Sequence, residues 1–354
     1  MNLLKEILFC HRNGKCFSRA LEVYPGIYKV SEESIFKNIK LDVNIYIIAG
    51  SNGIVFESGY GDCKNIKKFI KAFKEIKSDY AMRGLEFNIS RILISHAHPD
   101  HFSGLKKLNK KLGLKIILTE KMAEKIHCRT NFRKSYLFNK FESEIFKIST
   151  VQAIFMKLTT SIKMYMLEQI YGIGFIKKPD IIIDDNCTIQ INNDNWDIFL
   201  SPGHSDDHIS LYNKEKGLLF SGDNVLKLIP WLGPPKSDLS QYIRTLEVLS
   251  KLPSLNFIFG SHGEIIEDAV SWIVLIERWR EKRTQDILQL IIQRGACGIT
   301  PKEIEIEINS AENRSRRFYT VGWIYTTLSY LEEKRLIRHV DMSGRIKYLA
   351  VKNG

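Results

Sequence analysis

The sequence predicts an α/β fold, and three features of the chain support that prediction. Short apolar and β-branched runs recur along it, and their length and composition are typical of buried strands. Each run ends in small residues followed by a side chain that can bind a metal ion. A helical pattern, with Leu105 and Leu108 spaced i, i+3, follows the first of these ends. Chemistry at the junction between a strand and a helix is typical of α/β proteins.

The most informative segment follows the apolar run 91–94. It holds three histidines and one aspartate: His96, His98, Asp100 and His101. Imidazole is the commonest metal-binding side chain, and carboxylate is its usual oxygen partner. Four titratable groups in one loop carry a large desolvation cost unless positive charge lies among them. A pair of metal ions would supply that charge, whereas the alternative is a chance cluster on a solvated loop.

Three later segments repeat this design. The strand-like run 196–200 leads to His204, the run 218–220 leads to Asp223, and the run 257–259 leads to His262. Small residues before each of these side chains let the backbone adopt unusual conformations and approach closely. One such segment is common in proteins, but four in one chain reinforce one another.

In this order and spacing, the segments resemble the metallo-β-lactamase superfamily, over roughly residues 25–275. The resemblance implies an αβ/βα sandwich with the site at the sheet edges. It also implies three ligands for a first metal ion, three for a second and one bridging carboxylate: His96, His98 and His204; Asp100, His101 and His262; and Asp223.

Two details refine the resemblance. A bridging carboxylate at Asp223 is similar to the hydrolase and nuclease branches, which makes antibiotic hydrolysis the less favoured activity. Family members usually carry an aspartate in a D-x-G turn after an early strand, where this chain has Glu57. Because glutamate is one methylene longer, the supporting hydrogen bond to the site would need a shifted loop.

The implied ligand set predicts a hydrolase. Two cations about 3.5–4 Å apart can share a water and lower its pKa toward about 7. Asp100 could orient the resulting hydroxide, and His208 could contact substrate or merely stabilise its loop. Two divalent ions and two carboxylates leave net positive charge, which favours a small anionic acyl thioester or ester as substrate. The alternative function is a metal-dependent endoribonuclease acting on single-stranded RNA.

Composition fits an enzyme with a sizeable core. The chain has 354 residues, 44% of them hydrophobic, and no apolar run long enough to cross a membrane. No signal peptide is evident, and the six cysteines lack C-x-x-C spacing, which predicts free thiols in the cytoplasm.

The net charge of +12 suggests a nucleic-acid partner or, as we favour, a lysine-rich bias spread over the surface. Mixed histidine and carboxylate ligands suit zinc, with iron or manganese as alternatives.

The chain divides into a predicted catalytic domain, residues 1–278, and a C-terminal domain, residues 279–354. Residues 119–179 form a predicted helical insertion, with Leu137, Phe141, Ile145 and Ile148 at helical spacing. It could bind an anionic acyl carrier, a nucleotide or a polynucleotide, or simply pack its own core.

Three helices and a hairpin in the C-terminal part predict a winged helix, with Thr300 capping the helix that begins at Pro301. This pattern resembles a winged-helix subgroup of lactamase-like, glyoxalase II-related hydrolases. We expect a lid or a dimerisation module, which makes a homodimer a candidate assembly. DNA binding is the less favoured role.

Overall fold

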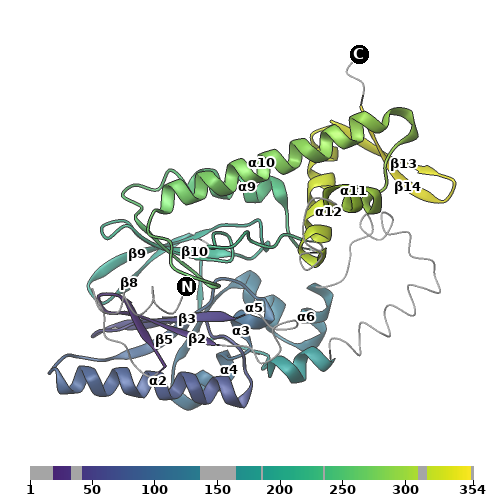
Figure 1. Ribbon diagram of the computed structural model, residues 1–354. Coiled ribbons are helices and arrows are strands. Elements are labelled where there is room, and N and C mark those ends of the chain that lie inside the picture. The colour runs from purple at the N-terminus through teal and green to yellow at the C-terminus, as the bar shows by residue number, and fades with distance from the viewer. Residues whose placement is uncertain are drawn as a thin grey trace.

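The computed structural model describes residues 19–32, 42–135, 165–184, 186–233, 236–309 and 317–351. Two β-sheets lie face to face with helices on both outer sides, and a C-terminal group of helices and a hairpin lies at one end (Figure 1). This arrangement confirms the predicted α/β sandwich.

The first sheet has seven strands, which lie in the order of the chain. They are β1 Leu21–Tyr24, β2 Ile27–Glu32, β3 Val43–Ile48, β4 Gly53–Phe56, β5 Ile89–Leu93, β6 Lys115–Thr119 and β7 Ile181–Ile183. Strands β1 to β4 pair antiparallel, whereas β4 to β7 pair parallel. The carboxyl ends of β4 and β5 therefore meet at one edge of the sheet.

The second sheet has five strands in the order β12-β11-β10-β9-β8. They are β8 Cys187–Ile191, β9 Asp194–Leu200, β10 Ile209–Asn213, β11 Leu218–Gly222 and β12 Phe257–Gly260. All three strand-like runs predicted in this part of the sequence are strands. Since β11 and β12 run parallel, their carboxyl ends also lie at a common edge.

Helices cover both outer faces of the sandwich. Those beside the first sheet are α2 Cys63–Met82, α3 Pro99–Phe102, α4 Leu105–Leu112, α5 Glu120–Ile126 and α6 Arg129–Ser135, and those beside the second are α9 Leu239–Leu249 and α10 Ala269–Arg294 (Figure 1). Within the described part of the chain, no helix combines the length and the apolarity that a membrane span requires.

Aromatic rings join the two sheets. The ring of Phe220 on β11 lies 5.1 Å from that of Tyr46 on β3 and 5.2 Å from that of Phe56 on β4, between ring centres. Phe259 on β12 stacks on Phe220 at 4.9 Å. All four side chains are buried. Such pairs contribute about 0.5–1.5 kcal/mol each beyond the area they bury, so they hold the sheet edges in register with one another.

The described part of the predicted insertion packs against the catalytic core. Phe132 on α6 is buried and its ring lies 5.4 Å from that of Phe102. Arg129 and Arg133 pair with the buried carboxylate of Glu168, which belongs to a helix over residues 165–171. These contacts favour packing over ligand binding for this part of the insertion. The predicted helix positions Leu137, Phe141, Ile145 and Ile148 lie outside the described residues.

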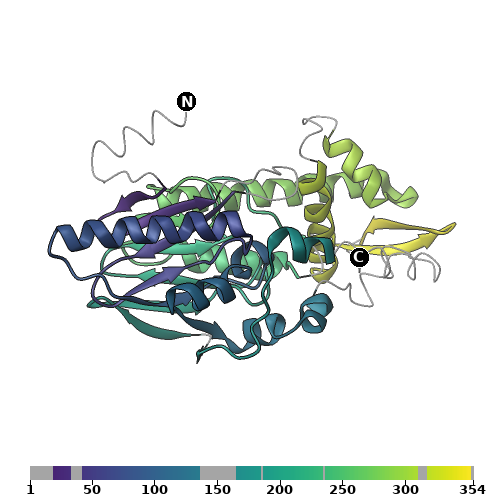
Figure 2. The same ribbon diagram turned by 90° about the horizontal axis from the view of Figure 1, so that it is seen from below.

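The C-terminal region contains the helices and hairpin in the predicted order. Its elements after α10 are the 3-10 turn Gly295–Cys297, α11 Pro301–Asn309, α12 Arg317–Glu333, β13 Ile337–Met342 and β14 Arg345–Ala350 (Figure 2). Thr300 caps α11 as predicted and forms a capping box with Glu303, each side chain accepting from the other's backbone N–H. The winged-helix assignment itself stays a prediction.

The predicted boundary between residues 278 and 279 falls inside the continuous helix α10. One hydrophobic core continues from Leu246 on α9 through Ile273 and Ile291 on α10 to Leu328 on α12. The Ser240 hydroxyl on α9 also donates to Glu333 on α12 at 2.6 Å. The C-terminal region is therefore packed onto the second sheet's helices rather than tethered to them.

Because of this shared core, Leu328→Ala should weaken both parts of the molecule together. We expect the free energy of unfolding to fall by about 2–5 kcal/mol, the usual cost of truncating a buried leucine. Thermal unfolding followed by circular dichroism should keep a single transition at a lower midpoint. Leu275→Ala, at a largely exposed position on α10, is the matched control and should change the midpoint little. Two separate transitions, of which the variant moves only one, would contradict a shared core.

Candidate metal centre

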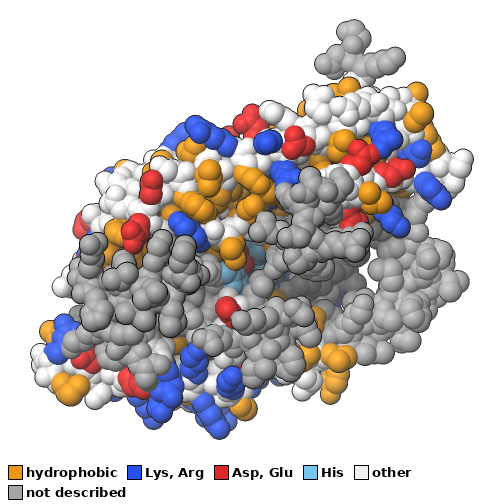
Figure 3. All heavy atoms as spheres, in the orientation of Figure 1, with side chains coloured by type: hydrophobic (Ala, Val, Ile, Leu, Met, Phe, Trp, Pro, Cys, Tyr) orange, Lys and Arg blue, Asp and Glu red, His pale blue; other side chains and the backbone are white. Residues whose placement is uncertain are grey.

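The carboxyl ends of four strands bring the predicted ligands to one place. His96, His98, Asp100 and His101 follow β5 and continue into α3, while His204 follows β9. Asp223 directly follows β11, and His262 lies two residues beyond the end of β12. Histidine side chains are visible at the floor of a hollow in the space-filling view (Figure 3). Backbone segments far apart in the sequence thus converge because both sheets end at this edge.

His96, His98 and His204 form a first cluster. The distance from His98 Nδ1 to His96 Nε2 is 2.8 Å, and that to His204 Nε2 is 3.0 Å. The rings of His96 and His204 are buried. Three imidazole nitrogens that point at one spot are the donor set of a tetrahedral zinc site with one open position.

Asp100, His101 and His262 form a second cluster beside the first. His101 Nε2 lies 3.6 Å from Asp100 Oδ1, and His262 Nε2 lies 3.5 Å from Asp100 Oδ2. Asp223 reaches both clusters, because its Oδ2 lies 3.5 Å from His204 Nε2, 3.5 Å from His101 Nε2 and 3.4 Å from His262 Nε2. All seven residues predicted as ligands therefore lie together.

Hydrogen bonds behind the ligands determine which ring nitrogen faces inward. His204 Nδ1 lies 2.7 Å from the carbonyl oxygen of Trp231, and His262 Nδ1 lies 2.6 Å from that of Asp42. A carbonyl can only accept, so each Nδ1 carries the proton. In the neutral form of each ring, which is the form that binds a metal ion, Nε2 then keeps a lone pair directed into the site. This arrangement prepares the rings to bind a cation.

Glu57 supports His101 from behind through an ion-pair contact rather than a well-aligned hydrogen bond. Its Oε2 lies 3.2 Å from His101 Nδ1, and both side chains are fully buried. The other oxygen, Oε1, accepts from the backbone N–H of Ser95 and from the hydroxyl of Ser261. The backbone of Glu57 has φ +73°, a left-handed conformation that is costly for a non-glycine residue. This left-handed turn is the local shift of the loop that lets the longer side chain reach His101.

Charge in the site supports cation binding. Burial lowers the pKa of His98 to about 3 and also lowers that of His204, so these rings are neutral at pH 7. Burial alone would raise the pKa of Asp223, but the His262 and His101 imidazoles hold it well below its usual value. Burial would likewise lower the pKa of His262, yet Asp223 and Asp100 raise it to about 10. The carboxylates of Asp100 and Asp223 therefore require positive charge beside them.

Buried polar atoms without hydrogen-bond partners indicate which kind of group should supply that charge. His101 Nε2, His262 Nε2 and Asp223 Oδ1 are buried and have no hydrogen-bond partner among the described residues. Buried polar atoms without partners are rare and costly. Since these atoms belong to the convergent donor set, the residues fit divalent metal ions, the cofactor class that the sequence predicts.

His208 lies behind the ligands rather than beside the substrate. It is fully buried, and its Nε2 accepts the backbone N–H of Asp223 at 3.1 Å. Its Nδ1 lies 2.8 Å from the Ser201 hydroxyl. Because both ring nitrogens are engaged, the geometry favours the loop-stabilising role over the predicted contact with substrate.

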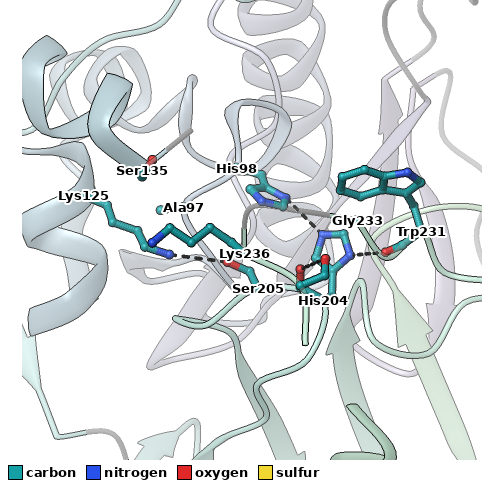
Figure 4. Close-up of a pocket in the computed structure, with 10 residues that line it drawn as sticks. Ala97, His98, Lys125, Ser135, His204, Ser205, Trp231, Gly233 and Lys236 are labelled. Atoms are coloured by element: carbon teal, nitrogen blue, oxygen red, sulfur yellow. Dashed lines mark hydrogen bonds between the residues drawn. The ribbon is translucent and has the colours of Figure 1, made fainter. Parts of the chain in front are cut away.

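A pocket opens beside the first cluster. Figure 4 shows His98, His204 and Trp231 on one side of it and Lys125 on the other, with Lys236 extending between them toward Lys125. Lys125 Nζ also donates to Asp207 at 2.7 Å, and Asp207 accepts from the backbone N–H of Ala97 at 3.0 Å. Sequence reasoning missed Lys125, since no spacing along the chain connects α5 to the loop that follows β9.

Glu57→Gln tests the support of His101. The amide can place an oxygen toward either His101 or the Ser95 and Ser261 donors, but not toward both. We expect zinc affinity to fall about 10–100-fold, the usual cost of losing such a partner, as measured by competition with a chromogenic chelator. Glu75→Gln, at a half-buried ion pair with Arg19, is the control and should match the wild type. Unchanged zinc affinity in Glu57→Gln would contradict this role.

Comparison with known proteins agrees with this geometry. The chain is 26% identical over 257 residues to the "Beta-lactamase-like protein 2 homolog" of Drosophila melanogaster, which covers 71% of this chain and 68% of that protein. It is 25% identical over 235 residues to human "Acyl-coenzyme A thioesterase MBLAC2", with coverage of 64% and 73%.

Among solved structures, a beta-lactamase domain protein from Burkholderia ambifaria has a similar fold, with a TM-score of 0.70 at 14% identity over 94% of this chain and 93% of that one. A family model described as "Metallo-beta-lactamase superfamily" matches residues 39–262, and the chain therefore belongs to the metallo-β-lactamase superfamily.

Proposed function

We propose that this hydrolase uses two divalent metal ions to cleave acyl thioesters or esters that carry anionic groups. The observation that carries the proposal is the position of Asp223. One of its oxygens lies within 3.5 Å of His204 from the first cluster and of His101 and His262 from the second. A carboxylate shared in this way suits two neighbouring cations rather than one. Zinc is the favoured ion, with iron or manganese as alternatives.

The residues of the site can each take a part in hydrolysis. Divalent ions held here would lower the pKa of a water and polarise the acyl oxygen. Asp100 is the more exposed of the two acidic ligands, with 18% of its side chain accessible against 9% for Asp223. It can accept a hydrogen bond from the attacking water and orient it. Water adds to the acyl carbon, the carbon–sulfur bond breaks, and the proton from water goes to the leaving thiolate.

The pocket suits an anionic substrate. Lys125 and Lys236 line it together with the ligands His98 and His204. Lys125 is neutralised in part by Asp206 and Asp207, whereas the structure gives Lys236 no ion pair among the described residues. The human relative is named an acyl-coenzyme A thioesterase, and coenzyme A carries phosphates that such lysines would attract. This combination favours a thioester over the alternative single-stranded RNA, for which the net charge of +12 is the main argument.

Metal content gives the first test of the proposal. Purified protein should contain about two divalent ions per chain by elemental analysis, and a chelator should abolish activity until metal is restored. Asp223→Ala should lose the shared carboxylate and nearly all turnover while circular dichroism shows an intact fold. Asp286→Ala, at an exposed position on α10, is the control. Full turnover in Asp223→Ala would refute a dinuclear mechanism.

A substrate panel gives the second test. Metal-loaded enzyme should hydrolyse acyl-coenzyme A or acyl-glutathione thioesters, with release of thiol detected by a thiol-reactive dye, and leave single-stranded RNA intact. Asp100→Ala should remove this activity, because water then lacks its acceptor. Cleavage of RNA alone, lost in Asp100→Ala, would establish the endoribonuclease alternative instead.

A further inference from the structure

Arg280 on α10 is a buried cation that the proposed chemistry does not use. Only 2% of its surface is accessible, and no carboxylate pairs with it among the described residues. Three aromatic rings surround its guanidinium carbon instead, with ring centres 5.0–5.5 Å away: Trp279, Tyr242 and Trp323. Cation–π contacts of this kind compensate part of the cost of burying a guanidinium.

One guanidinium nitrogen of Arg280 binds the loop beside the metal centre. Nη2 donates to the backbone carbonyl of Pro230. The next carbonyl along the chain, that of Trp231, accepts from Nδ1 of the ligand His204 at 2.7 Å. Arg280 thus binds the carbonyl group that directly precedes the one that sets the tautomer and the orientation of His204.

Helix α12 holds the same loop from another direction. Gly322 lies so close that a Cβ there would meet Leu232 O at 3.0 Å, Gly233 Cα at 3.1 Å and Trp231 Nε1 at 3.3 Å. A contact this tight would force the loop to move by a few tenths of an ångström. A glycine within a helix is unfavourable on its own, so the close approach explains why it occurs here.

We propose that Arg280 and α12 act together as a clamp that positions the loop 230–233, and through the Trp231 carbonyl the metal ligand His204. The C-terminal region is then a working part of the metal centre and not only a neighbouring module. Arg280 is a positioning residue, because it acts through the loop and contacts neither metal ligand nor pocket. The inference rests on metal binding at His204 and is independent of which substrate is cleaved.

If Arg280 had a purely structural role, its substitution would have different effects. A cation that only fills the space between aromatic rings would affect stability alone, as any buried side chain of this core does. A clamp would in addition affect the mobility of residues 231–233 and the affinity for metal. The two roles are therefore separated by comparing Arg280→Met with Leu328→Ala, which truncates the same core six residues further along α12 than Gly322.

The decisive experiment measures zinc affinity by chelator competition and, in metal-free protein, amide hydrogen exchange at residues 231–233. Arg280→Met should bind zinc about 10–100-fold more weakly and exchange faster at these residues. Leu328→Ala should unfold at a lower temperature with unchanged affinity and exchange. Gly322→Ala, which favours the helix but displaces the loop, should weaken zinc binding several-fold and provides the test if Arg280→Met does not fold.

Three outcomes are distinguishable. Wild-type affinity and exchange in both Arg280→Met and Gly322→Ala would overturn the clamp. Equal losses of affinity in Leu328→Ala and Arg280→Met would also overturn it, because general destabilisation would then explain the effect. Absence of zinc binding in the wild type would refute the proposed function, whereas the exchange measurement on metal-free protein would still decide whether Arg280 holds the loop.

Discussion

The need to balance two buried carboxylates and a third, half-buried one is the constraint on which the site depends. Glu57, Asp100 and Asp223 all lie around the ring of His101, in a place that water hardly reaches. Burying negative charge without compensation is far more costly than the marginal stability of a protein allows. Without metal, protons on His101 and His262 meet part of this demand, and carboxylates accordingly raise the pKa of both rings. Divalent ions balance the negative charge more fully. Metal binding and the charge balance of the fold therefore depend on each other.

Residues from both sheets take part in this charge balance. Asp100 and His101 come from the end of β5 in the first sheet, whereas Asp223 and His262 come from β11 and β12 in the second. The supporting groups cross between the sheets as well, since Glu57 after β4 accepts from Ser261 after β12. The aromatic contacts of Phe220 therefore do more than fill the core. They keep two strand edges aligned to within the tolerance that metal coordination demands.

The sequence predicts the ligand set from local information, and the fold brings the seven predicted residues together. A strand, small residues and then one ligand-type side chain form a pattern readable within about ten residues. The sequence identifies Glu57 as the candidate for the supporting role but leaves its geometry open, since that geometry depends on a left-handed turn and on contacts with residues about 40 and 200 positions away. His208 illustrates the opposite case. Its spacing from His204 allowed contact with substrate, and only the fold shows that both ring nitrogens are taken by Ser201 and the Asp223 backbone.

The sequence predicts the C-terminal region as a separate unit because its helix patterns and capping box are complete in themselves. A helical pattern identifies an apolar face but not the surface that the face covers. Here the partner surface is α9 and the loop 230–233, so α10 continues through the predicted boundary and carries Arg280 to that loop. A cation among aromatic rings can bind a carbonyl without adding a carboxylate to a region that already holds an excess of negative charge. That choice of partner lets the C-terminal helices support His204 while the charge balance of the metal centre stays unchanged.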